Sequence, residues 1–147
     1  SDPYYDSGLR ILVRADNDSV EGLEDLEGLE VGTKIGSTSY DFLTRELEDD
    51  EGVTPYPGSS DMYMALMSRA IDAVFYDAPN VGYFAQTKGE GQVKTVGPLY
   101  EGQQYGIALK KGSEWVGEVN DALASMKDDG TYDEIYKKWF GELPDSE

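Results

Sequence analysis

The sequence predicts an α/β fold, because short apolar runs that favour strands alternate with amphipathic stretches that favour helices. The clearest strand is residues 73–76, an uninterrupted Ala-Val-Phe-Tyr run that precedes an Asp-Ala-Pro-Asn segment typical of a helix start. The clearest helix comes just before this strand, where Met62, Leu66 and Ala70 recur every four residues. The length of 147 residues suits one compact domain with a core of its own.

The other elements follow from the same two patterns of apolar spacing. Further strands are expected at residues 9–13, 30–35, 53–56, 93–96 and 104–109. Helical segments are expected at residues 18–26, 40–47, 59–70, 78–87, 113–127 and 131–140. Candidate helix caps are Ser19, Ser59, Ser60 and Thr131.

The composition excludes several classes of function. The chain has no cysteine, so it forms no disulfide and offers no thiolate nucleophile. It has no histidine either, so Ser-His-Asp and Cys-His catalysis cannot be built within it. A formal charge of −18 repels phosphate backbones, so no nucleic-acid partner is expected. The acidic run Asp49, Asp50 and Glu51 lacks the glycine-punctuated spacing of a calcium loop, so a solvated turn is expected there and not a calcium site. No other metal and no cofactor is expected.

Five segments, taken in order along the chain, resemble one known family, the periplasmic amino-acid-binding proteins. Residues 1–9 resemble the crossover from the first lobe of these proteins to the second, and residues 31–39 (Val-Gly-Thr-Lys-Ile-Gly-Ser-Thr-Ser) resemble the second-lobe ligand loop. Residues 70–77 (Ala-Ile-Asp-Ala-Val-Phe-Tyr-Asp) resemble the strand that bears the ligand carboxylate. Residues 103–113 are similar to the strand that returns to the first lobe, and residues 130–141 to the C-terminal signature.

The resemblance is strongest to the glutamine-binding proteins of ABC importers, and it implies a fold and a division of the chain. The expected fold is one type II lobe, a central, mostly parallel sheet flanked by helices, with two C-terminal helices added. Residues 1–8 would be a remnant of the first lobe and the crossover, and residues 9–108 the second, ligand-closing lobe. Residues 109–147 would hold the end of the return strand and the helices that normally pack on the first lobe. Most of that first lobe would be missing, including the Arg and the Thr or Ser that the resemblance would place on the ligand's carboxylate.

Residues 36–39, Gly-Ser-Thr-Ser, lie where a predicted strand ends and a helix begins. Glycine lets the backbone approach a ligand closely, and free N–H groups at a helix start favour an anion. The spacing alone favours simple helix capping by a hydroxyl group. The resemblance instead favours a ligand loop, in which the Thr38 backbone contacts the carboxylate of an amino acid and Gly36, Ser37 and Ser39 surround it.

Asp77 is the best single candidate for a binding residue. It follows a predicted strand, so its carboxylate lies where ligands bind in open α/β sheets, and it can pair with an ammonium group or cap the next helix. The resemblance assigns the α-ammonium group of an amino acid to Asp77. It also implies that Lys34 points at the ligand, although a solvated lysine is the commoner fate. Tyr76 stands where glutamine-binding relatives carry a histidine, and it fits a core position equally well.

Three hypotheses about function follow. The leading one is a fragment of the solute-binding component of an importer for polar amino acids, which docks on a membrane permease and makes or breaks no bond. The second is a stand-alone lobe that pairs as a homodimer by swapping its C-terminal helices. The third and weakest is an enzyme of the prephenate- or arogenate-dehydratase type. A periplasmic or extracellular location is expected, although the chain as given shows no secretion signal.

Overall fold

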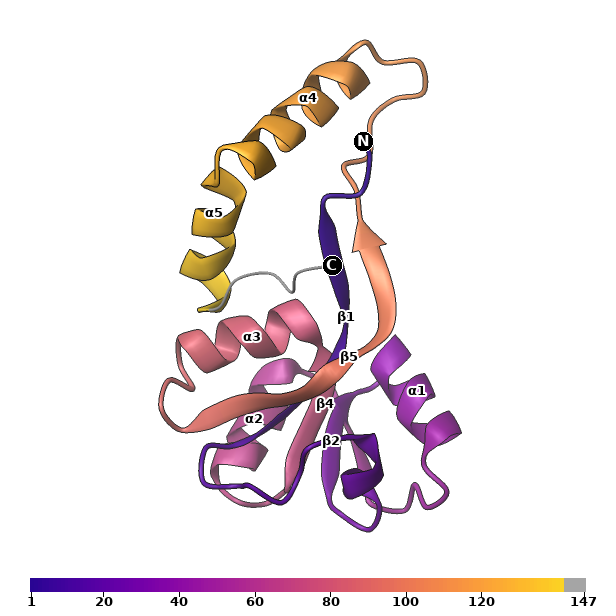
Figure 1. Ribbon diagram of the computed structural model, residues 1–147. Coiled ribbons are helices and arrows are strands. Elements are labelled where there is room, and N and C mark those ends of the chain that lie inside the picture. Colours follow the sequence, from indigo (N-terminus) through magenta and orange to yellow (C-terminus); the bar gives the residue numbers. More distant parts are fainter. Residues whose placement is uncertain (142–147) are drawn as a thin grey trace.

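The computed structural model describes residues 1–141 and shows a twisted sheet with helices on both faces, from which a two-stranded arm extends (Figure 1). The strands are β1 (Tyr5–Arg14), β2 (Val31–Lys34), β3 (Val53–Tyr56), β4 (Ala73–Asp77) and β5 (Val93–Tyr105). The helices are the 3-10 turn η1 (Leu23–Leu26), α1 (Thr38–Glu46), α2 (Ser59–Met67), α3 (Ala78–Gln86), α4 (Trp115–Asp128) and α5 (Thr131–Phe140).

The sheet has the strand order β3-β2-β4-β1-β5. Strand β2 pairs in parallel with both β3 and β4, whereas β1 pairs antiparallel with β4 and β5. Within the described part of the chain, β1 therefore runs one way and the other four strands run the opposite way. This confirms the predicted α/β class with a mostly parallel sheet.

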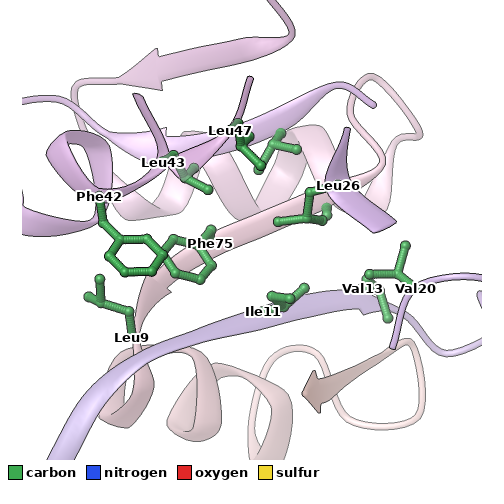
Figure 2. Close-up of a cluster of buried hydrophobic side chains, with 11 residues drawn as sticks. Leu9, Ile11, Val13, Val20, Leu26, Phe42, Leu43, Leu47 and Phe75 are labelled. Atoms are coloured by element: carbon green, nitrogen blue, oxygen red, sulfur yellow. The ribbon is translucent and has the colours of Figure 1, made fainter. Parts of the chain in front are cut away.

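Two hydrophobic clusters cover the two faces of the sheet, because successive strand residues point to opposite sides. On one face Phe75 of β4 packs with Phe42 of α1, their ring centroids 5.3 Å apart, beside Leu9 and Ile11 of β1 (Figure 2). The opposite face buries the neighbouring residues of the same strands against α2 and α3. This second cluster consists of Leu12, Met62, Tyr63, Leu66, Ile71, Val74, Tyr76, Val81 and Val93.

The amino-terminal part of β1 and the last part of β5 leave the sheet together as the arm, defined here as residues 1–8 and 101–109 (Figure 1). The arm is held by the pairing of Tyr5 with Tyr105 and by a 2.7 Å bond from the Ser1 amino group to the carbonyl of Ile107. From the far end of the arm, α4 and α5 (the tail helices) return toward the sheet, and the tip of α5 reaches α3.

Several sequence-based boundaries were wrong, each for a local reason. The strand predicted at residues 104–109 is only the end of β5, since β1 supplies no partner beyond Tyr5, which pairs with Tyr105. The helix predicted at 18–26 shortens to η1, because the Ser19 amide and hydroxyl both donate to the Asn17 side chain in a turn. Of the other proposed caps, Ser59 and Thr131 are first helical residues and Ser60 is the second, and glycines occupy the N-cap positions before α2 and α5.

The Phe75 side chain should be a main source of stability, because it is fully buried between β1 and α1 directly before the candidate site. Phe75→Ala should lower the free energy of unfolding by about 3–5 kcal/mol, the usual cost of removing a core aromatic ring. Urea denaturation followed by circular dichroism measures this. Met64→Ala, at a side chain that is 62% exposed, is the matched control and should change stability by less than about 0.5 kcal/mol. A loss below about 1 kcal/mol for Phe75→Ala would contradict the packing described.

Candidate ligand-binding site

The parallel pairing of β2 with β3 and β4 brings three strand ends to one edge of the sheet. Lys34 and Tyr56 are direct partners at the ends of β2 and β3, and Asp77 ends β4. A helix begins within a few residues of each strand end: α1 at Thr38, α2 at Ser59 and α3 at Ala78. This carboxyl-terminal edge therefore presents a carboxylate, an ammonium group and the N-termini of three helices, and helix N-termini attract negative charge.

The loop between β2 and α1 is shaped by one glycine. Gly36 has a φ of +68°, a left-handed conformation that side-chain-bearing residues adopt at a cost. A Cβ placed on Gly36 would meet nothing within 4 Å, so backbone conformation and not space requires glycine here. The turn lets Ser37 cap α1, because the Ser37 hydroxyl accepts a 3.4 Å bond from the Tyr40 amide.

A chain of hydrogen-bonded hydroxyl groups holds this loop on its interior side. The Ser37 hydroxyl lies 2.6 Å from the Lys34 carbonyl, and its single proton goes there because a carbonyl only accepts. Ser39 must then donate to Ser37 across 2.7 Å, and Thr33 must donate to Ser39 across 2.8 Å. Since Thr33 and Ser39 are both 0% exposed, these hydroxyls are structural and face the interior.

Thr38 is the exposed residue of the loop and the first residue of α1. Its N–H lies in the first turn, where backbone donors have no acceptor within the helix. The sequence left two interpretations of this loop open, helix capping and contact with an anion. In the structure, neighbouring residues fit the two roles. Ser37 caps the helix, and the Thr38 backbone remains the candidate anion donor.

Asp77 occupies the N-cap position of α3, yet its side chain makes no capping hydrogen bond. Its carboxylate is only partly exposed, and this burial raises its pKa above the ordinary value of 3.8, an effect that the positive charge of Lys34 partly offsets. A carboxylate that is partly desolvated and not used for capping is suited to pair with a cation.

Tyr76 differs from the other candidates. It is 6% exposed and belongs to the hydrophobic cluster beneath α2 and α3, so the structure places its side chain in the core. Tyr56 and the start of α2 were not singled out from the sequence, although they share the edge with Lys34 and Asp77. The parallel pairing of β2 and β3, followed by a Pro57-Gly58 turn, is the signal that places them there.

Comparison with known proteins decides the family. The family model of the bacterial extracellular solute-binding proteins, family 3, matches residues 1–142. The chain belongs to this family. Its members are solute-binding transport proteins and not enzymes. Among residues 1–141, no helix is both long enough and apolar enough to cross a lipid bilayer.

Individual relatives agree with this assignment. The chain is 34% identical over 149 residues to the ABC transporter glutamine-binding protein GlnH of Bacillus subtilis, covering 98% of the chain and 52% of GlnH. The chain thus spans about half the length of the curated relatives it matches.

Solved structures of the family superpose along almost the whole chain. The open conformation of substrate-binding domain 2 of Lactococcus lactis GlnP gives a TM-score of 0.84 at 31% identity, covering 99% of this chain and 62% of that one. An ancestral arginine-binding protein bound to glutamine gives 0.65 at 41% identity, covering 97% and 63%. The fold predicted from the resemblance, a type II periplasmic-binding-protein lobe, is confirmed.

The buried hydroxyl chain makes a testable contribution to stability. Ser39→Ala should lower the free energy of unfolding by about 1–3 kcal/mol, because it leaves the Thr33 hydroxyl buried beside a methyl group. Thr38→Ala, one residue away and exposed, should change it by less than about 0.5 kcal/mol. Urea titration of the two variants measures the difference, and equal effects would contradict the assigned hydroxyl chain.

The raised pKa of Asp77 predicts a pH-dependent effect on stability. The folded state binds this proton more tightly than the unfolded state, so the stability contributed by the carboxyl is complete below the unfolded pKa and is lost as pH rises through the folded pKa. Asp77→Asn has no such loss. The variant should therefore gain stability relative to the parent protein as the pH rises from about 3 toward 7, as measured by thermal melting at several pH values. A difference that is flat across this range would rule out burial of the charge.

Proposed function

We propose that this chain supplies the second-lobe half of an amino-acid cleft in the solute-binding component of an ABC importer for polar amino acids. The observation that supports this most is Asp77, a partly buried carboxylate at the carboxyl-terminal edge of the sheet that does not cap its own helix. The names of the relatives support the ligand class, since GlnH binds glutamine and the ancestral protein is bound to glutamine.

Each polar group of the edge has a partner on a free amino acid. Asp77 pairs with the α-ammonium group in a charge-assisted hydrogen bond. The Thr38 N–H, at the positive end of α1, donates to the α-carboxylate. Lys34 donates to an acceptor on the ligand, which favours an amide or carboxylate side chain over a cationic one. Gly36, Ser37 and Ser39 hold the loop in shape, and Tyr76 supports the edge from the core.

The division of the chain follows from the same proposal. Residues 9–108 are the second lobe, residues 1–8 its junction with a first lobe, and residues 109–147 the return to that lobe, of which residues 142–147 lie outside the described part. The rest of the cleft would come from the part of the receptor that corresponds to the half of the relatives outside the matched region. The assembled receptor works outside the cytoplasm, in the periplasm or at the cell surface, and delivers its ligand to a membrane permease.

A second candidate is a homodimer in which the tail helices pack on a neighbouring copy. The exposed apolar side chains of the tail favour it: neither α4 nor α5 buries any residue, and Trp115 is 65% exposed. Light scattering during size-exclusion chromatography separates the candidates. A mass near twice 16.2 kDa supports the dimer and a mass near 16.2 kDa excludes it.

A half-cleft leaves much of the ligand in water, so this chain alone should bind polar amino acids only in the millimolar range. Titration of glutamine into ¹⁵N-labelled protein should shift the amide signals of Thr38 and Asp77 in a saturable way. Asp77→Asn should abolish these shifts, because the amide carries no charge to pair with the ammonium group. Two-dimensional ¹H–¹⁵N NMR measures both.

The control for charge is Asp121→Asn, which removes an exposed carboxylate on α4 and should leave the shifts intact. A second control is the ligand itself, since the analogue of glutamine without its amino group should bind much more weakly. The proposal fails if Asp77→Asn and the parent protein respond equally, or if the isolated monomer binds an amino acid with sub-micromolar Kd.

A further inference from the structure

The tail helices are tied to the arm by a group of aromatic rings. The ring of Tyr5 on β1 lies 5.8 Å from Tyr136 and 5.8 Å from Phe140 of α5, and 5.5 Å from Tyr105 on β5. Tyr136 and Phe140 are themselves 4.8 Å apart. Because aromatic pairs at these separations attract each other, these rings hold α5 against the arm.

The tip of α5 also contacts the sheet domain, defined here as residues 9–100. Trp139 lies 6.0 Å from Tyr83 of α3, ring centroid to ring centroid. Phe140 packs closely over Gly82, where a Cβ would come within 3.4 Å of the Phe140 ring. These contacts fall on α3, whose N-cap is Asp77. The helix that begins at the proposed ammonium site is thus also the helix that α5 touches.

Between these two anchor points the ladder of β1 and β5 is irregular. The pairing of β1 with β5 changes register between Ser7 and Leu9 and again between Leu9 and Ile11, which marks bulges in the ladder. Glu101 has a φ of +46°, rare for a residue with a side chain. Gly8 lies so close to β5 that a Cβ would come within 2.5 Å of the Tyr100 carbonyl oxygen. The junction of the arm and the sheet domain is therefore the irregular part of the ladder, and a rotation of one against the other would be centred there.

The contact between α5 and α3 spans this junction, so a rotation there must change it. Tyr83 and Trp139 are 48% and 49% exposed, which makes the contact a partial one that a modest free energy can break. The chain superposes better on the open GlnP domain, at a TM-score of 0.84, than on the glutamine-bound ancestral protein, at 0.65, although the latter is more similar in sequence. The contact is thus present in an arrangement that resembles an open one.

We propose that the Trp139–Tyr83 contact is a latch that holds the tail helices and the sheet domain in this open arrangement. Any closing rotation about the junction at Gly8 and Glu101 has to break or rebuild the latch. A contact that stabilises one of two arrangements lowers the affinity of whatever binds the other, in proportion to the population it removes. Resting on the proposed function, the latch would therefore oppose ligand-induced closure and weaken amino-acid binding.

Distances between spin labels test the latch without any ligand. The chain has no native cysteine, so Asp41→Cys on α1 and Ala124→Cys on α4 give one clean pair of labels on exposed sites. Double electron–electron resonance should show that Trp139→Ala and Tyr83→Ala each move population away from the parent distance, and that the double variant adds little more. Trp115→Ala, which removes an exposed tryptophan from α4, should leave the distribution unchanged.

A distribution that is unchanged in Trp139→Ala and Tyr83→Ala overturns the latch, as does an equal change in Trp115→Ala. In titrations with ligand, both latch variants should bind glutamine more tightly than the parent protein. The expected gain in affinity is about 2- to 10-fold, the equivalent of one aromatic pair. Weaker binding would show that the contact supports the site and does not oppose closure. If the parent binds no amino acid at all, the proposed function fails, while the label distances still decide the latch.

Discussion

The candidate site depends on the parallel pairing of β2 with β4. Only two residue pairs form this ladder, Val31 with Ala73 and Gly32 with Val74, yet they bring Lys34 and Asp77 to the same edge. The packing over this ladder is close at Gly32, where a Cβ would come within 2.6 Å of the Ile71 side chain and 3.1 Å of Met62. A larger residue at Gly32 would have to displace the end of the Ile71 side chain and would crowd Met62, so glycine here lets α2 and the following segment pack closely against β2.

A consequence of this arrangement is that the site is held ready at a cost in stability. Asp77 is partly buried, and the only nearby compensation that affects its pKa is the charge of Lys34. The hydroxyl chain from Thr33 to the Lys34 carbonyl holds the loop in one shape, so under the proposed function little ordering would remain for a ligand to impose. A residue that lowers stability in this way is common at functional sites, which fits the role proposed for Asp77.

The local spacing of apolar residues was enough to predict those helices and strands whose sequence follows a single clear pattern. Residues 73–76 lie in β4 as expected, because a short, fully apolar run followed by a helix start fits a buried strand. The break expected after residue 96 does not exist, since Gly97 adopts a φ of +73° inside a bulged stretch of β5 and the strand continues. A Gly-Pro step normally signals a turn, and only the long partner strand β1 makes it a bulge here.

Local sequence pattern was also insufficient for the candidate site wherever contacts between distant residues decide the role of a side chain. Asp77 and the loop after β2 could be singled out as candidates from the sequence. Asp77 follows a strand and precedes a helix, whereas the loop became a candidate through the family resemblance, since its spacing alone favoured capping. The separate roles of Ser37, Thr38 and Ser39 could not, since they depend on which hydroxyl points inward. The sequence did not decide whether Tyr76 contacts a ligand or belongs to the core. Side chains alternate along β4, and this alternation turns Tyr76 toward α2 and α3, away from the edge.

The most direct measurement is the pKa of the Asp77 carboxyl with and without an amino acid present. It is read from the ¹³C signal of that carboxyl as a function of pH and assigned by its absence in Asp77→Asn. The account predicts a pKa above 3.8 in the free protein that falls when glutamine is added, because a bound ammonium group favours the charged carboxylate. A pKa that starts at its ordinary value, or that does not change at glutamine concentrations that shift the Thr38 amide, would contradict the account.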